Sequence, residues 1–184
     1  MTNDYPKLIL EVKTESPFGY RAGKSWDELF AIAEKYGDII SVHTDARWGG
    51  SFDLIQKAKS LTNKPILAKG IHATDKEIIQ ALDAGADYVL VVGRIPLVGG
   101  ENCIVEPNTL VELKNIPEEY KVVWNSRDLA TGGLKQETFA QARSIWKGWL
   151  CQASNIRTIA DIDPGADAVL VGTHLEEFVV GLRR

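Results

Sequence analysis

One stretch of the sequence, residues 65–93, limits the possible folds more than any other. It reads PILAKGIHATDKEIIQALDAGADYVLVVG. An apolar run at Ile66–Ala68 precedes a segment with helical spacing that begins after Thr74, a suitable N-cap, and a second apolar run covers Tyr88–Val92. A strand, a helix and a strand in this order make a parallel pair, which is buried on both faces. The stretch predicts an α/β fold with Lys69 at the carboxyl end of a strand, where such folds place their chemistry.

The same alternation continues along the chain. Further apolar runs predict strands near residues 8–12, 39–43, 103–105, 120–124, 149–152 and 168–171, with helices near 25–36, 51–60, 109–114, 135–146 and 175–182. The segment RIPLVGGEN after the fourth strand has no helical period, so the fourth helix is expected to be missing or a single turn. GADYVLVVG at 85–93 recurs as GADAVLVGT at 165–173. A compact (β/α)8 TIM barrel with shortened or missing helices is therefore favoured over a doubly wound open sheet.

Composition sets the class of protein. A chain of 184 residues with 45% hydrophobic residues and a net charge of -4 fits one domain over 1–184, with half-barrels at approximately 1–98 and 99–184. The sequence has no basic stripe of the kind that binds nucleic acid or a membrane surface. It also has no apolar run that approaches the roughly 20 residues of a membrane helix. The start lacks a secretory pattern, and Cys103 and Cys151 lack CxxC spacing, so a cytoplasmic protein with reduced thiols is expected.

Polar residues stand at the predicted carboxyl ends of many strands. In chain order these are Glu11, Lys13, Lys69, Glu106, Asn125, Arg127, Ser154, Gly172 and Thr173. In a barrel these ends meet at one mouth, so the side chains should converge there. Strand alternation places Glu11 and Lys13 on the same face. A lysine among apolar walls is suited to donate a proton near neutral pH, and a buried carboxylate to accept one.

The ionisable candidates each have a structural alternative. Glu11 and Lys13 could form an ion pair that fills the barrel. Lys69 could extend along the surface to solvent, and Glu106 could be a loop carboxylate. The segment 125–128, NSRD, could be ordinary turn chemistry.

The remaining candidates concern phosphate and aromatic groups. Gly172 and Thr173 follow an apolar strand and precede a helix, which suits phosphate binding, with Ser154 and Asn155 as neighbouring donors. A tight turn with a threonine cap fits the same residues. Trp48 could cover an aromatic ligand or form a plain hydrophobic lid. The three histidines show no metal-ligand spacing, so no metal site is expected.

Seven motifs together resemble one family. They are Glu11-Val12-Lys13 with Ser16-Pro17, ISVHTDARWGGS with its Trp48, PILAKG, IVEP at 104–107, WNSRDL at 124–129, ASNI at 153–156, and GADAVLVGTHL at 165–175. In this order they resemble indole-3-glycerol phosphate synthase, the barrel enzyme of tryptophan biosynthesis. The resemblance extends over nearly the whole sequence.

The resemblance implies an activity and roles for the site residues. The family converts 1-(2-carboxyphenylamino)-1-deoxyribulose 5-phosphate to indole-3-glycerol phosphate, carbon dioxide and water, with neither metal nor organic cofactor. By similarity, Lys69 is the general acid at the ketone oxygen and Glu106 the proton-transfer partner in dehydration, while Glu11 and Asn125 hold the reacting centre. Substrate binding then falls to Lys13, Ser16, Trp48, Arg127 and Ser154, and phosphate binding to Lys13, Asn155, Gly172 and Thr173. The implied partner is a phosphorylated small molecule, and a monomer is expected.

The sequence also departs from the family pattern. Ala68, Gly70 and Ile71 stand where the family usually has Arg, Asp and Phe, so Lys69 is expected to lack a neighbouring carboxylate. Ala153 replaces a usual Glu and Asn155 a usual Gly, and a shortened barrel without the family's N-terminal helical extension is expected. Two alternatives therefore stay open: another phosphosugar lyase or isomerase on the same barrel, or a phosphate-ligand-binding barrel with weak or no activity.

Overall fold

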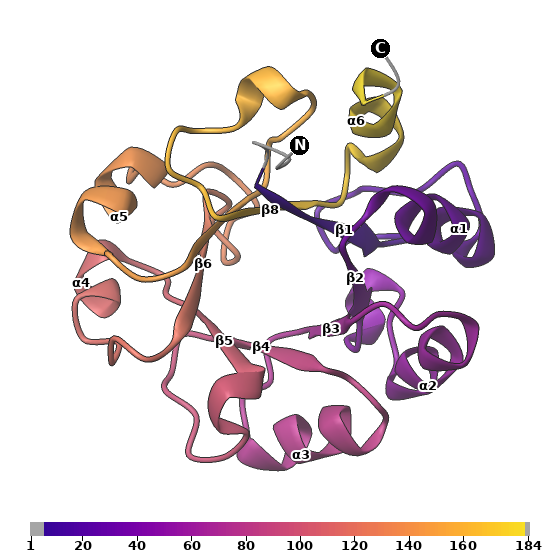
Figure 1. The fold of residues 1–184 in the computed structure, drawn as a ribbon, viewed down its shortest axis with the longest axis horizontal. Helices are drawn as coiled ribbons and strands as arrows, with labels where there is room; N and C mark the ends of the chain where they lie inside the picture. The colour runs from indigo at the N-terminus through magenta and orange to yellow at the C-terminus, as the bar shows by residue number, and fades with distance from the viewer. Residues whose placement is uncertain (1–5, 183–184) are drawn as a thin grey trace.

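Within residues 6–182, which the computed structural model describes, eight parallel strands close into a barrel in which β8 pairs with β1 (Figure 1). The strands are β1 (Lys7–Val12), β2 (Ile39–His43), β3 (Ile66–Lys69), β4 (Tyr88–Val92), β5 (Cys103–Glu106), β6 (Lys121–Asn125), β7 (Leu150–Ala153) and β8 (Ala168–Val171). The closed parallel barrel confirms the fold expected from the sequence. It also places the carboxyl ends of all the strands around one mouth.

Helices surround the barrel on the outside (Figure 1). They are α1 (Trp26–Tyr36), α2 (Phe52–Leu61), α3 (Asp75–Asp83), α4 (Leu110–Leu113), α5 (Phe139–Ile145) and α6 (Leu175–Gly181). Side-chain oxygens of Ser25, Ser51 and Thr74 accept backbone hydrogen bonds at the starts of α1, α2 and α3, as their sequences predict.

The helix predicted from residue 135 begins later than expected. Thr138 and Gln141 form a capping box, so α5 starts at Phe139. The backbone N–H of Lys135 instead donates to the carbonyl of Ser126 at 2.8 Å, which keeps this segment in the β6–α5 loop. The error arose because helical spacing alone does not reveal a competing loop hydrogen bond.

The connection between β4 and β5 contains no α-helix in the described chain, only the single turn η2 (Gly100–Asn102). Gly99 before this turn has a φ of +83°, and a Cβ there would lie 2.6 Å from the sulfur of Cys103. Two other single turns, η1 (Ala46–Trp48) and η3 (Ile159–Asp161), follow β2 and β7. The absence of an α-helix between β4 and β5 in the described chain agrees with the sequence prediction.

Strand alternation divides the buried apolar residues into an inner and an outer set. Ile9 of β1 packs inside the barrel, while Leu10 and Val12 face the helices. The inner set also contains Ile39, Leu67, Leu90, Ile104, Val123, Cys151, Ala153, Ala168 and Leu170. These side chains fill most of the barrel below the mouth, and the charged residues of the cavity lie at its carboxyl end.

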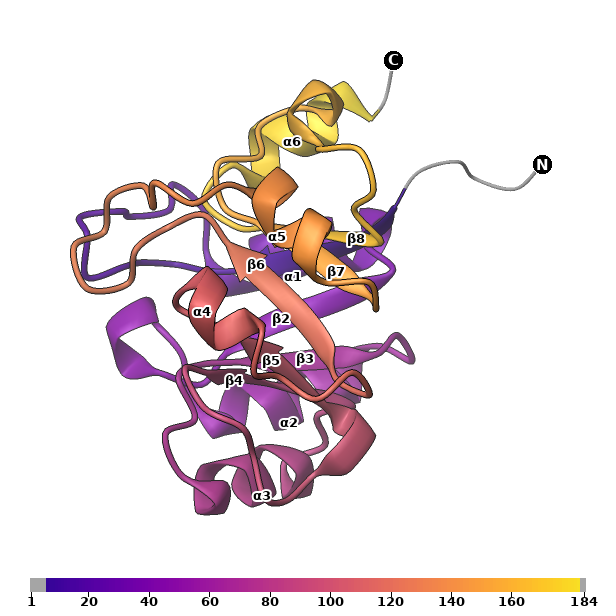
Figure 2. The same cartoon turned by 90° about the vertical axis from the view of Figure 1, so that its left-hand side faces the viewer.

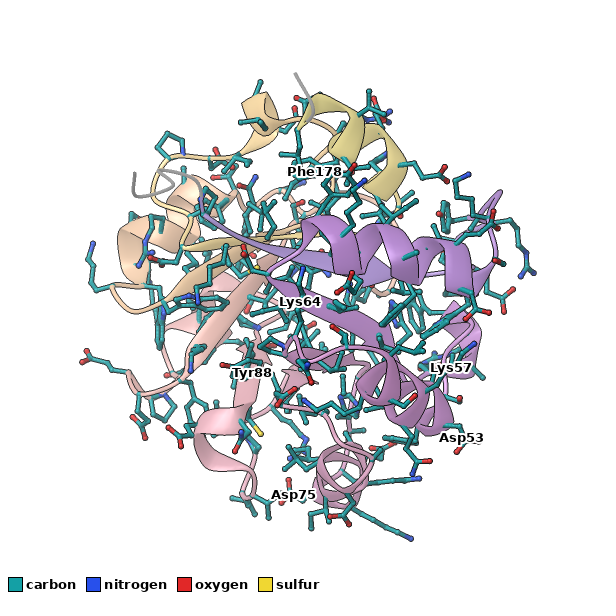
Figure 3. The ribbon with its side chains drawn as sticks, turned by 45° about the vertical axis from the view of Figure 1, so that its right-hand side comes forward. Asp53, Lys57, Lys64, Asp75, Tyr88 and Phe178 are labelled. Atoms are coloured by element: carbon teal, nitrogen blue, oxygen red, sulfur yellow. The ribbon has the colours of Figure 1, made fainter. Side chains whose placement is uncertain are left out.

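Charged side chains join neighbouring helices on the outer surface. Figure 3 labels Asp53 and Lys57 on α2, and the Lys57 ammonium lies 2.6 Å from Asp27 of α1. Lys64, also labelled there, donates to the carbonyl of Gly37 at 2.8 Å, just past the end of α1. A cation at a helix carboxyl end complements the helix dipole. In the part of the chain that the structure describes, no helix is long and apolar enough to cross a membrane.

Candidate active site

A cavity opens at the carboxyl ends of the strands, and its empty space, with the open solvent at the mouth included, is about 700 Å³. Its polar lining residues are Glu11, Lys13, His43, Lys69, Glu106, Asn125, Arg127, Ser154, Asn155, Thr173 and His174. Thus the mouth brings together side chains that are as far apart in the sequence as β1 and the residues after β8. The convergence predicted from the strand ends is present.

Glu11 is the centre of the charged cluster. Its Oε1 atom accepts a hydrogen bond from the Lys69 ammonium at 2.8 Å and lies 2.5 Å from Nε2 of His43. Lys13 lies 3.7 Å from the other carboxylate oxygen, Oε2. Burial would raise the pKa of Glu11, which is 2% exposed, but the charges of Lys69 and Lys13 and the contact with His43 hold this pKa well below its usual value. Glu11 is therefore an anion at neutral pH.

Lys69 does have a carboxylate partner. The replacement of the usual Asp by Gly70 suggested that the lysine would lack one, but Glu11 reaches it across β2. Lys69 is 16% exposed and lines the cavity, so it does not extend along the outer surface. The ion pair between Glu11 and Lys13, which the sequence left open as a structural alternative, is present, at a longer distance than the pair with Lys69.

The pKa of Glu106 is shifted in the direction opposite to that of Glu11. Glu106 is 2% exposed, and burial raises its pKa even though the charge of Lys69 and a hydrogen bond from Asn125 favour the anion. The Asn125 amide nitrogen donates to Glu106 Oε1 at 2.9 Å. Two carboxyl groups in one cavity thus have pKa values displaced in opposite directions, which is the arrangement that separates a permanent anion from a proton carrier.

Asn125 is held in a fixed orientation. Its carbonyl oxygen accepts from the Ser154 hydroxyl at 2.7 Å and from the Arg127 backbone N–H at 3.0 Å. This leaves the amide nitrogen to face Glu106. The Arg127 guanidinium donates to the carbonyl of Gly132 at 3.0 Å, so it also braces the β6–α5 loop.

Lys13 and Thr173 form the end of the cavity between β1 and β8. The Lys13 ammonium donates to the Thr173 hydroxyl at 2.7 Å and lies 5.2 Å from the centre of the Tyr20 ring. Burial lowers the pKa of Lys13, and Glu11 opposes this effect. At Gly172, a Cβ would lie only 1.6 Å from Glu11 Oε2. Any side chain at this position would thus have to displace the carboxylate of Glu11, a constraint that the sequence did not reveal.

The residues after β7 adopt left-handed backbone conformations. Ser154 has a φ of +71° and Asn155 a φ of +58°. Asn tolerates this region better than most residues, which explains how it replaces the family's glycine. The Asn155 amide donates to the Ser126 hydroxyl at 3.2 Å.

Aromatic residues cover one side of the mouth. Trp48 lies parallel to the His43 ring, with centroids 5.7 Å apart, and meets Phe18 edge-on at 6.4 Å. The loops after β1 and β6 extend together at the left of Figure 2, and a Cβ on Gly132 would lie 2.4 Å from the Phe18 ring. Ser16 lies outside the cavity lining, and its hydroxyl accepts from the backbone N–H groups of Phe18 and Tyr20 at 3.3 Å.

Sequence reasoning missed three residues in or near the cavity, namely His43, His174 and Lys135. His43 ends β2, so the rule that identified Lys69 and Glu106 would have identified it as well. Lys135 was assigned to a helix, but its ammonium donates to the Pro107 carbonyl at 3.3 Å and its charge favours the anionic form of Glu106. Burial lowers the pKa of Lys135. No group of three histidine, cysteine or acidic residues suited to a metal ion occurs within residues 6–182.

The fold and this mouth define a TIM-barrel protein with its candidate site at the carboxyl ends of the strands. The model of the indole-3-glycerol phosphate synthase family matches residues 1–98. The chain belongs to this family.

Two curated relatives carry the name indole-3-glycerol phosphate synthase. The protein of Acaryochloris marina is 31% identical over 204 residues, covering 92% of this chain and 66% of that protein. The protein of Sulfurisphaera tokodaii is 34% identical over 96 residues, covering 51% of this chain and 39% of that protein. The chain thus spans less than two thirds of the length of either relative.

Two solved structures have the same fold. A 3-hexulose-6-phosphate synthase superposes with a TM-score of 0.65 at 16% identity and covers 94% of this chain and 99% of that one. A mutant tryptophan synthase α-subunit from Pyrococcus furiosus superposes with a TM-score of 0.61 at 15% identity and covers 92% of this chain and 88% of that one. At this identity the likeness concerns the barrel alone.

Proposed function

We propose that this protein converts 1-(2-carboxyphenylamino)-1-deoxyribulose 5-phosphate to indole-3-glycerol phosphate, releasing carbon dioxide and water. Family membership supports the substrate class. The observation that carries the proposal is that one cavity holds two carboxyl groups of opposite character, Glu11 with a lowered pKa and Glu106 with a raised pKa. The ammonium of Lys69 is bonded to Glu11 and its charge acts on both groups. Such a site holds a fixed anion, a cationic proton donor and an exchangeable proton within one cavity.

The ring-closing step is assigned to Lys69. A bond forms between the ring carbon that bears the carboxylate and the ketone carbon of the substrate, and the Lys69 ammonium gives a proton to the ketone oxygen. The carboxylate then leaves as carbon dioxide, and its bonding electrons restore the aromatic ring. Glu11 stays ionised throughout and holds the ammonium in place through the 2.8 Å contact.

The dehydration step is assigned to Glu106. The protonated carboxyl group of Glu106 gives its proton to the new hydroxyl, which leaves as water, and the carboxylate that results takes the proton lost from the new ring, so this step needs a group that exchanges protons near neutral pH. The raised pKa of Glu106 suits that task, and Asn125 orients its carboxyl group through the 2.9 Å hydrogen bond.

The two ends of the cavity suggest how the substrate binds. Lys13, Gly172 and Thr173 would receive the phosphate, because they supply a cation, a hydroxyl and close-lying backbone. Trp48 would contact the aromatic ring of the substrate from the β2–α2 loop. On this proposal the bound partner is a phosphorylated small molecule.

A phosphate-ligand binder without turnover is the second candidate. It is favoured by the contact between Lys13 and Thr173, which depends on neither Lys69 nor Glu106. Anion binding at this end would therefore survive even where proton transfer fails.

The test adds the ribulose phosphate to purified protein and follows indole fluorescence. We expect turnover by the wild type, loss in Lys69→Ala, and retention in Lys147→Ala, a lysine on the outer surface whose ammonium bonds the Ser144 carbonyl. Absence of signal at high protein concentration, or equal signal from Lys69→Ala, would refute the synthase proposal. Protection against thermal unfolding by inorganic phosphate without any turnover would support the binder instead.

A further inference from the structure

His43 lies between the charged cluster and the aromatic cover of the mouth. It ends β2, is 4% exposed, and has Glu11 on one side and Trp48 on the other. The proposed reaction assigns it no part. Its contacts nevertheless connect the residue that holds the proton donor with the loop over the cavity.

The imidazole shares one oxygen with the proton donor. Nε2 of His43 lies 2.5 Å from Glu11 Oε1, and the Lys69 ammonium lies 2.8 Å from that same atom. Burial lowers the pKa of His43, although Glu11 opposes this effect. The ring is therefore neutral near pH 7, and because Nε2 faces an anion, its hydrogen belongs on Nε2.

The geometry excludes His43 as a base acting on substrate. Its other nitrogen, Nδ1, is sealed from solvent and has no hydrogen-bond partner among residues 6–182. The parallel ring of Trp48 restrains the imidazole from turning. His43 therefore acts on the site only through Glu11.

We propose that His43 is a positioning residue that fixes the carboxylate of Glu11, which in turn places the ammonium of Lys69 for proton donation. The inference rests on the proposed synthase function. Without the imidazole, Oε1 loses a donor and the carboxylate is free to turn toward Lys13, which lies 3.7 Å from Oε2. Lys69 would follow it, and a displacement near 1 Å lowers a rate by about a hundredfold.

Two matched variants test this role. His43→Leu removes the donor and retains an apolar side chain, whereas the amide of His43→Gln still donates to Glu11. We expect kcat of His43→Leu to fall about ten- to a hundredfold with KM changed less than about threefold, and His43→Gln to regain most of kcat. The melting temperature of His43→Leu should stay near that of the wild type, because the buried nitrogen without a partner disappears while the buried carboxylate of Glu11 loses one of its donors.

Equal loss of kcat in both variants, or unchanged kcat in His43→Leu, would overturn the inference. Should the wild type show no turnover, the synthase proposal fails separately, and NMR decides whether His43 is coupled to Lys69. We then expect a slowly exchanging His43 Nε2 proton whose chemical shift changes in Lys69→Met. An unchanged shift in that variant would overturn the inference.

Discussion

The position of Gly172 leads to a prediction that depends on a single methyl group. A Cβ at residue 172 would lie 1.6 Å from Glu11 Oε2 and 2.7 Å from the carboxyl carbon. To reach ordinary van der Waals separation, the carboxylate would have to move by about 2 Å. The end of a side chain normally swings aside easily, but here Lys69, Lys13 and His43 hold it in place.

We therefore expect Gly172→Ala to damage both activity and stability. A displacement of this size breaks the contact with Lys69, so turnover should fall at least about a hundredfold. Overpacking in a buried site destabilises by about 1–3 kcal/mol, which lowers the melting temperature by about 2–12 °C for a chain of this size. Indole fluorescence and thermal unfolding measure the two effects.

A control glycine and a double variant complete the test. Gly181, at the end of α6, has nothing within 4 Å of its Cβ position, so Gly181→Ala should leave both measurements nearly unchanged. In a Glu11→Ala variant the carboxylate that would clash with the new methyl group is gone. Adding Gly172→Ala to that variant should therefore cause almost no further destabilisation. Wild-type turnover and melting temperature in Gly172→Ala would refute the reasoning. Persistent destabilisation in the double variant would show that the backbone at 172 matters independently of Glu11.

Three further predictions concern charged groups. Because burial raises the folded-state pKa of Glu106, its ionisation destabilises the fold as pH rises, so Glu106→Gln should abolish turnover yet raise the melting temperature, more at pH 8 than at pH 5. The folded-state pKa of Glu11 is lowered, so the stabilisation from its ionised form is present above the unfolded-state pKa and disappears in acid. As the pH falls below about 4, the free energy of unfolding, measured by chemical denaturation, should decrease more steeply in the wild type than in Glu11→Gln. Lys64→Met loses its bonds to the carbonyls of Glu34 and Gly37 and should destabilise by about 1–3 kcal/mol, while turnover, measured in the same preparation, stays at the wild-type level.

Much of the fold could be predicted because its signals are local. The strands are short apolar runs. Ser25, Ser51 and Thr74 mark helix starts, because each side chain accepts from the backbone N–H of the residue three positions later. The start of α5 was missed because it depends on a loop contact between Lys135 and Ser126 that periodicity does not contain.

The sequence allowed us to predict which residues lie at the site, but not which of them contact each other. Strand alternation and barrel closure identify Glu11, Lys69 and Glu106 as neighbours at one mouth. Which groups touch depends on strand register, in which Glu11 pairs with Ser41 and His43 pairs with Lys69. Alternation tells which face a residue is on but not which residue of the next strand lies beside it, so the shared oxygen of Glu11 and the steric role of Gly172 required the structure.

The connection between β4 and β5 offers a natural place to divide the molecule. A break near Leu97, which is 88% exposed, would interrupt no α-helix of the described chain. One fragment would then carry Lys69 and the other Glu106, so neither piece alone would contain both of the residues proposed to transfer protons. If the proposed activity is present, recovered turnover after mixing the two fragments would report directly on barrel reassembly, since the candidate site is complete only when β4 pairs with β5 and β8 pairs with β1.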